Sequence, residues 1–339
     1  MKTSVLVLLL MFFINIGAAN AQISFAPLVE ELMPTVVNIS TDIKKTEDSP
    51  EVLNNLIFDE KDRENLGSGF IIDSQGYIAT NLHVIENANK ISVITSNGEV
   101  YDAALIGQDK KTDIALVKIN VEDTLSSVVF GDSDMVKVGD WVLAIGNPFG
   151  LGSSVTAGII SAKSRDIGDS PYNNYLQTDA SINQGNSGGP MFNIDGEVVG
   201  INTAIFSNSG TAVGVGFALP SNDVKWILQE LKENGSVQRS WLGVELKKAT
   251  AKEGLSGFVI VSFIDMNLAK RNGFEIGDMI LEYDSNKSAS LKDFSYYISR
   301  LEPQTEVKVK LWRNGEIMEL NVIVENKDNN ENKISENKR

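Results

Sequence analysis

Short apolar runs separated by turn residues repeat from residue 23 to residue 217, and this pattern restricts the fold more than any other feature of the chain. The clearest runs are Ile91–Ile94, Ile114–Ile119, Trp141–Ile145 and Val198–Ile201. Short runs that recur every 8–12 residues or so are typical of antiparallel sandwiches and barrels. Helical periodicity is nearly absent here. The pattern predicts a mainly β domain over residues 22–235, in which the polar, acidic stretch 44–65 is expected to be a long surface loop.

One helix is predicted at the end of this domain. The apolar residues that share its face are Val224, Ile227, Leu228 and Leu231. Ser221 or Asn222 is the expected cap, and Asn234-Gly235 is the expected end. A domain boundary is therefore predicted near residue 235.

Residues 236–325 combine strand and helix patterns and predict a smaller, mixed α/β domain. Leu291–Leu301 has a helical pattern, and Asn314-Gly315 between two apolar runs predicts a β-hairpin. Residues 326–339 are rich in Asn, Lys and Glu, with Ile334 as the one apolar residue. They are predicted to form a disordered tail, because they offer too little apolar surface to bury.

The first 21 residues have the pattern of an export signal. Lys2 precedes an apolar run from Val5 to Ile14, and Ala19-Asn20-Ala21 supplies small residues for cleavage. The run is shorter than the roughly 20 residues that span a bilayer. A cleaved signal peptide is therefore predicted, and a retained membrane anchor is the alternative.

Composition excludes several kinds of function. The chain has no cysteine, so disulfides, thiolate metal sites and cysteine nucleophiles are excluded. Its formal net charge is −15 and it has no basic stretch, so it would repel phosphate backbones, and no nucleic-acid partner is expected. We also expect no cofactor and no metal.

Two motifs carry the candidate chemistry. The one histidine, His83, directly follows a predicted strand, and an imidazole can accept and return a proton at physiological pH. Ser187 lies among glycines in Gly185-Asn186-Ser187-Gly188-Gly189, and a serine hydroxyl becomes a nucleophile when a base removes its proton. Glycines also let the backbone aim two N–H groups at one point, as an oxyanion hole requires. A surface glycine turn is the alternative reading of this motif.

The order of these residues separates two classes of hydrolase. Gly-x-Ser-x-Gly also occurs in α/β-hydrolases, but there the histidine follows the serine. Here the histidine comes first, which is the chymotrypsin order of His, Asp and Ser. The acid is then expected between residues 83 and 187, and the candidates include Asp102, Asp109, Asp113 and Asp132. Asp113 stands out because it opens an apolar strand.

The chain resembles the HtrA/Deg family of bacterial serine proteases in a set of stretches between about residues 24 and 325. They are Gly67-Ser68-Gly69-Phe70, Thr80-Asn81-Leu82-His83-Val84-Ile85, Thr112-Asp113-Ile114-Ala115-Leu116, Gln177–Asn183 running into Gly185–Pro190, Gly200-Ile201-Asn202-Thr203 and Gly214–Ala218. The resemblance implies a chymotrypsin-like double β-barrel followed by a PDZ domain.

The resemblance also implies roles for single residues. His83 would be the general base, Asp113 would orient it, and Ser187 would attack the peptide carbonyl. The N–H groups of Gly185 and Ser187 would form the oxyanion hole.

A preference for small or aliphatic side chains before the cleaved bond is expected. Ser181 stands where trypsin-like relatives carry the aspartate that selects basic side chains. Ile182 and Ile205 would be apolar walls of the specificity pocket, with plain core packing as the alternative for both.

The second domain resembles the PDZ domains of bacterial proteases. Trp241-Leu242-Gly243-Val244 matches the loop that captures a terminal carboxylate on backbone N–H groups, and Ile298 with Leu242 and Val244 would line the side-chain pocket. Gly277-Asp278-Met279-Ile280 matches a second signature. Arg165 is the candidate for the residue that couples peptide binding to the active-site loops.

The resemblance implies a periplasmic serine endopeptidase of envelope protein quality control. Its expected partners are misfolded or signal-bearing polypeptides as substrates, C-terminal peptides at the PDZ domain, and two further copies of the chain in a homotrimer. The alternatives are a membrane-anchored stress-sensor protease of the inner membrane and a non-proteolytic chaperone or scaffold with the same fold.

Overall fold

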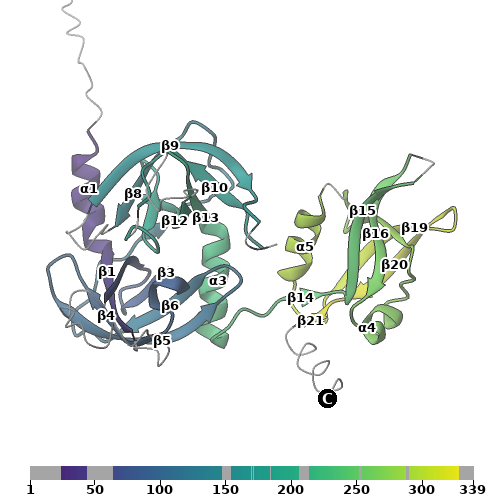
Figure 1. Cartoon of the computed structure of the whole chain (residues 1–339), viewed down its shortest axis with the longest axis horizontal. Helices are drawn as coiled ribbons and strands as arrows, with labels where there is room; N and C mark the ends of the chain where they lie inside the picture. Colours follow the sequence, from purple (N-terminus) through teal and green to yellow (C-terminus); the bar gives the residue numbers. More distant parts are fainter. Residues whose placement is uncertain are drawn as a thin grey trace, which may run out of the picture.

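The computed structural model describes residues 24–43, 64–146, 154–168, 170, 172–183, 185–205, 214–251, 254–287 and 290–327. The predicted signal peptide lies outside these residues, as do most of the loop predicted at 44–65 and most of the predicted tail. Figure 1 shows two β-sheets beside helix α3, and a smaller unit that follows α3.

The first sheet is a closed antiparallel barrel. Its strand order is β1 (Val36–Ile43), β2 (Glu64–Ile71), β3 (Tyr77–Asn81), β6 (Ile114–Ile119), β5 (Val100–Asp109) and β4 (Ala88–Ile94). Glu64 and Asn65 pair with β1, so the loop predicted to run to residue 65 ends before Glu64. Pairing with a neighbouring strand outweighs the polar character of these two residues.

The second sheet also closes on itself. Its order is β11 (Pro190–Phe192), β8 (Trp141–Gly146), β9 (Ser154–Arg165), β10 (Tyr175–Thr178), β13 (Gly216–Pro220), β12 (Glu197–Ile205) and β7 (Val129–Phe130), and β11 also pairs with β12. The predicted mainly β, double-barrel architecture is confirmed.

Two short helices were not expected from the sequence. Helix α1 (Ala26–Leu32) leads through a 3-10 turn (Met33–Thr35) into β1, and α2 (Leu82–Ile85) follows β3. Seven and four residues are too few to show a helical period, so such helices escape pattern analysis.

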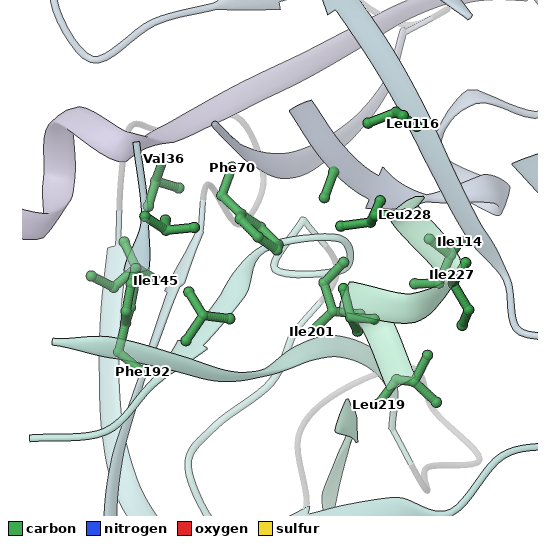
Figure 2. Close-up of a cluster of buried hydrophobic side chains, with 14 of the residues drawn as sticks. Val36, Phe70, Ile114, Leu116, Ile145, Phe192, Ile201, Leu219, Ile227 and Leu228 are labelled. Carbon is green, nitrogen blue, oxygen red and sulfur yellow. The ribbon is translucent and has the colours of Figure 1, made fainter. Parts of the chain in front are cut away.

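Helix α3 (Ser221–Asn234) joins the two barrels, with the four predicted apolar residues buried. These residues belong to one hydrophobic cluster that takes Ile114 and Leu116 from the first barrel and Ile201 and Leu219 from the second (Figure 2). The predicted end is confirmed, because Gly235 adopts the left-handed conformation. The predicted cap is wrong: Pro220 is the cap residue, and the Ser221 hydroxyl donates to the carbonyl of Gly131 at 2.8 Å.

The smaller unit contains a six-stranded sheet and two helices. The strand order is β15 (Val244–Thr250), β16 (Ser256–Phe263), β17 (Met279–Tyr283), β19 (Glu306–Arg313) and β20 (Glu316–Ile323), and β18 (Asn286–Lys287) pairs with β17. The helices are α4 (Met266–Arg271) and α5 (Leu291–Ser299), the latter as predicted apart from its last turn. The predicted hairpin is confirmed, since Arg313 pairs with Glu316 across Asn314-Gly315.

The tail predicted from residue 326 begins with ordered residues. Strand β21 (Glu325–Asn326) pairs with β14 (Ser240–Trp241), and the Lys327 N–H donates to the carbonyl of Arg239. Backbone pairing orders these residues although they bury little apolar surface. The remaining residues of the tail lie outside the described part.

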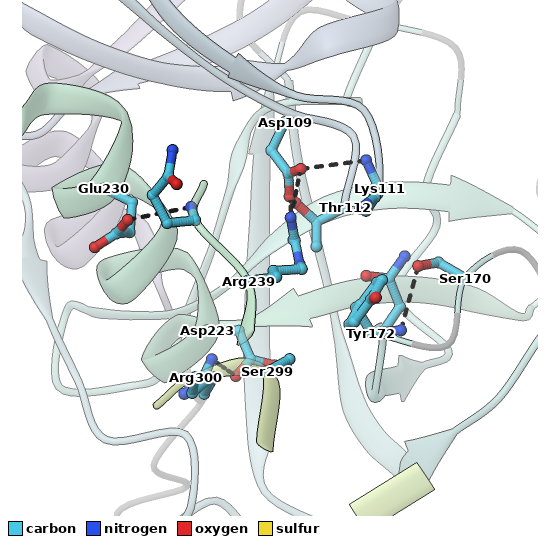
Figure 3. Close-up of polar contacts among 12 residues, drawn as sticks. Asp109, Lys111, Thr112, Ser170, Tyr172, Asp223, Glu230, Arg239, Ser299 and Arg300 are labelled. Carbon is cyan, nitrogen blue, oxygen red and sulfur yellow. Dashed lines mark hydrogen bonds and ion pairs between the residues drawn. The ribbon is translucent and has the colours of Figure 1, made fainter. Parts of the chain in front are cut away.

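Polar contacts connect the smaller unit and its linker to the barrels (Figure 3). Arg239, in the linker, makes a bidentate ion pair with Asp109 of β5, and both side chains are buried. Asp223 of α3 accepts hydrogen bonds from Arg300 and from the hydroxyl of Tyr296 on α5. Burial and the nearby Asp223 raise the pKa of Tyr296, which keeps this hydroxyl protonated as a donor.

No helix among the described residues has the length and apolar character needed to cross a bilayer.

Candidate active site

His83 and Asp113 form a two-bond contact on the first barrel. His83 Nδ1 lies 2.5 Å from Asp113 Oδ2, and the backbone N–H of His83 donates to Asp113 Oδ1 at 2.9 Å. The contact turns Nδ1 toward the acid and leaves Nε2 for another partner. The other three candidate aspartates have different partners: Asp102 pairs with Lys90, Asp109 with Arg239 and Asp132 with Asn222.

The backbone of Asp113 is held in an unusual conformation. Its φ of 59° is left-handed, which few residues with a Cβ adopt. The amide of Asn81 donates to the Asp113 carbonyl at 2.7 Å, and the N–H of Leu82 donates to the same oxygen at 2.9 Å. The Asn81 amide also reaches Thr203 Oγ1 on β12, at 3.3 Å. Asn81 therefore connects the acid to the second barrel.

The turn that carries Ser187 packs against the first barrel. Gly188 has a φ of 81°, and a Cβ there would lie 2.3 Å from the Ser68 carbonyl oxygen and 2.4 Å from Thr80 Oγ1. Only glycine fits this position. Since Thr80 lies three residues before His83, the close approach brings the serine turn to the strand that leads into α2.

Gly185 and Ser187, the predicted oxyanion donors, lie on either side of Asn186 in this turn. Gly185 has a φ of 98°, and the Asn186 carbonyl between the two donors accepts from the N–H of Gly189 at 3.0 Å. Within the described residues, the N–H groups of Gly185 and Ser187 have no hydrogen-bond acceptor.

The predicted triad also requires a contact between the Ser187 hydroxyl and the His83 ring. Within the described part of the chain, no hydrogen bond joins the Ser187 hydroxyl to the His83 ring, whose side chain is 46% exposed. Such bonds are often long in unliganded enzymes and shorten when substrate binds. The structure thus contains the acid–base pair and a serine turn packed beside it.

The predicted pocket residues lie next to this turn. The Ser181 carbonyl accepts bonds from Thr156 Oγ1 at 2.9 Å and from the Asn186 amide at 3.3 Å. Ile182 is buried, and a Cβ on Gly216 of β13 would lie 2.6 Å from Ile182 Cγ1, so the two segments are in close contact here. The side chain of Ile205 lies outside the described part.

A groove of about 150 Å³ lies between β15 and α5 of the smaller unit. The predicted residues Trp241, Leu242, Val244 and Ile298 line it, together with Leu246, Phe294 and Tyr172. Gly243, also predicted, has a φ of 72°, and its carbonyl accepts from the N–H groups of Ile264 and Asp265. The sequence prediction missed Tyr172, which belongs to the segment that follows β9 rather than to the smaller unit.

Arg165 is exposed at the end of β9, where its Nε donates to Gln177 Oε1 at 3.0 Å. The next residue, Asp166, forms an ion pair with Lys292 of α5 at 3.4 Å. The segment that begins at Arg165 therefore touches the helix that lines the groove.

Among the described residues, no cluster of three His, Cys, Asp or Glu side chains could hold a metal ion.

Comparison with known proteins defines the class of both parts. A family model for the trypsin-like peptidase domain matches residues 67–201, and one for the PDZ domain matches residues 240–324. The fold and the site are therefore those of a trypsin-like peptidase joined to a PDZ domain.

The relatives identify the family. A probable periplasmic serine endoprotease, DegP-like, from Rickettsia conorii is 44% identical in an alignment 331 residues long that covers 88% of this chain and 65% of the relative. A protein of the same description from Brucella suis is 42% identical over 266 residues, or 76% and 52% of the two chains. The solved structure of the HtrA-type protease AlgW with a decapeptide is 36% identical, with a TM-score of 0.76, and covers 90% of this chain and 99% of that one.

The chain belongs to the family of HtrA-type proteases. It spans between about half and two thirds of the length of these curated relatives.

Proposed function

We propose that the chain is a periplasmic serine endopeptidase that hydrolyses misfolded or signal-bearing polypeptides in envelope protein quality control. The observation that carries the proposal is the two-bond contact between His83 and Asp113 beside the serine turn. The names of the relatives, which describe periplasmic serine endoproteases, support the activity and the compartment.

The proposed mechanism follows from the orientation of the His83 ring. Asp113 holds Nδ1 of His83, so Nε2 of His83 accepts the proton of the Ser187 hydroxyl. At the same time the Ser187 oxygen attacks the peptide carbonyl. The N–H groups of Gly185 and Ser187 stabilise the negative oxygen of the tetrahedral intermediate. His83 then protonates the leaving amine, and water hydrolyses the acyl-enzyme.

Specificity and regulation form the second part of the proposal. Cleavage after small or aliphatic residues is proposed, because Ser181 offers no carboxylate for a basic side chain. A peptide with a free C-terminus binds the groove between β15 and α5 and acts on the protease domain through the segment that begins at Arg165. The ion pair between Asp166 and Lys292 supports this route, and the decapeptide in the AlgW structure supports peptide binding.

Assembly as a homotrimer is the third part. The ring of Phe25 in the N-terminal segment lies 5.8 Å from that of Trp141, which is 44% exposed. Two neighbouring aromatic rings at the surface support a subunit contact.

The experiment that tests the activity compares Ser187→Ala with a matched control, Ser96→Ala, on an unfolded protein substrate. Ser96 is an exposed serine on a turn of the first barrel. We expect the purified Ser187→Ala protein to release no peptides and Ser96→Ala to keep the wild-type rate. Persistent hydrolysis by Ser187→Ala would exclude the mechanism, and an inactive wild-type protein that still prevents aggregation would favour the chaperone alternative.

A further inference from the structure

Ser68 of β2 makes two hydrogen bonds to the turn that carries Ser187. Its hydroxyl donates to the Gly185 carbonyl at 2.6 Å, and its backbone N–H donates to the Ser187 carbonyl at 3.0 Å. The side chain is fully buried, and Thr80 Oγ1 donates to the Ser68 carbonyl at 2.7 Å. One residue of the first barrel thus holds two carbonyl groups of the second.

These bonds act on alternate peptide units of the turn. The unit between Gly185 and Asn186 is held at both ends, since its carbonyl accepts from Ser68 and its N–H donates to Asn183 at 3.0 Å. The unit between Ser187 and Gly188 is also held at both ends, by Ser68 and by the Asn202 carbonyl at 2.8 Å. Because peptide units are planar, fixing one end of each unit restricts the other.

The two proposed oxyanion donors lie on the units next to the held ones. The Gly185 N–H belongs to the peptide unit just before the held unit of Gly185 and Asn186. The Ser187 N–H belongs to the peptide unit between the two held units. The φ of 98° at Gly185 belongs to a region that glycine enters and leaves freely, so the residue itself does little to fix the direction of its N–H. That direction depends on bonds to the neighbouring units.

We infer that the Ser68 hydroxyl is a positioning group for the oxyanion hole. It touches neither the substrate nor the reacting atoms, and acts by holding the Gly185 carbonyl so that the adjacent N–H points at the developing oxyanion. The inference rests on the proposed function, because it requires Ser187 to be the nucleophile. It adds a residue of the first barrel to the machinery that stabilises the transition state.

The test compares Ser68→Ala with Ser221→Ala in the chain of 339 residues. Ser221 is a matched control, because its side chain is also fully buried and its hydroxyl also donates to a glycine carbonyl, that of Gly131 at 2.8 Å, but in α3. Each variant loses one buried hydrogen bond, so both are expected to lose a similar amount of stability in chemical denaturation. For each variant, kcat and KM are measured on a peptide substrate, together with inhibition by a peptide boronate, which forms a tetrahedral adduct at the serine.

Ser68→Ala is expected to lower kcat about 10- to 100-fold with little change in KM, because misplaced donors weaken transition-state binding alone. Its affinity for the boronate should fall by a similar factor, whereas Ser221→Ala keeps the wild-type kcat. If both variants keep the wild-type kcat, or if Ser68→Ala changes KM and leaves kcat intact, the inference is wrong. An active Ser187→Ala protein would instead overturn the proposed function itself.

Discussion

At the scale of single residues, Asp113 is held by hydrogen bonds to both its side chain and its backbone carbonyl. Its carboxylate accepts two bonds from His83, and its carbonyl accepts two more from Asn81 and Leu82. These bonds stabilise a left-handed backbone that would otherwise be strained. The orientation of the His83 ring therefore depends on one carboxylate.

Asp113→Asn tests this dependence. The amide can keep the geometry but favours the wrong tautomer of His83, so kcat is expected to fall about 1,000- to 10,000-fold. Hydrolysis of a peptide substrate measures the effect. Asp102→Asn is the control, because Asp102 is an exposed aspartate of the same barrel that pairs with Lys90, and it should retain wild-type kcat. Equal activity of the two variants would show that Asp113 is not the acid of the triad.

At the scale of elements, helix α3 connects the barrels through its apolar face and through a polar contact near its end. Lys232 lies 3.0 Å from Asp73, which is in the turn between β2 and β3, and also covers the ring of Tyr77. Burial alone would raise the pKa of Asp73, but bonds from Lys232 and from two backbone N–H groups of the turn outweigh it. The pKa therefore lies below its ordinary value.

This lowered pKa predicts a pH-dependent contribution to stability. The folded chain favours the ionised carboxylate, so the contribution is present above the ordinary carboxyl pKa, near 4, and is lost as the pH falls below it. Asp73→Asn should lower the free energy of unfolding at pH 7 by about 0.5–1 kcal/mol, a modest figure because the pair is partly exposed. Denaturant unfolding at pH 7 and pH 3 measures it, with the exposed Asp123→Asn as control. A difference from wild type that persists undiminished at pH 3 would contradict this account.

At the scale of the whole molecule, the PDZ domain and its linker contact the protease domain at separate points. Arg239 pairs with Asp109, four residues before Asp113, Arg300 pairs with Asp223 of α3, and Tyr172 lines the groove between β15 and α5. A bound peptide can shift the protease only through a difference in affinity between its two states. These contacts offer places where that difference can arise.

Val244→Glu tests the groove. Val244 lines it and is half-buried, so a carboxylate there should repel a peptide terminus without disrupting the core. Wild-type hydrolysis should respond to peptides with an apolar C-terminal residue, with a coupling of about 1–3 kcal/mol, and Val244→Glu should lose the response. Ile317→Glu, an exposed residue on the far edge strand β20, is the matched control and should respond as wild type does. An equal response to amidated peptides would contradict recognition of the terminal carboxylate.

The sequence by itself determined the mainly β character of the first domain, helix α3 and most of the residue types of the site. Turn-punctuated apolar runs indicated an antiparallel sandwich or barrel, and the order of His83 and Ser187 selected the chymotrypsin arrangement over the α/β-hydrolase one. The glycines at 185 and 188 indicated a sharp turn, and both have positive φ angles in the structure. These features are readable because they are local: burial and turn geometry leave their mark within a few residues.

Only the tertiary structure decided which groups meet. It chose Asp113 over Asp102 and Asp132 as the partner of His83, paired Asp109 with Arg239, and brought Ser68 to the carbonyl of Gly185. It also placed Tyr172 in the groove and paired the Lys327 N–H with the carbonyl of Arg239. Most of these contacts join residues far apart in the chain, and their geometry depends on how the barrels close and pack, which no local pattern encodes.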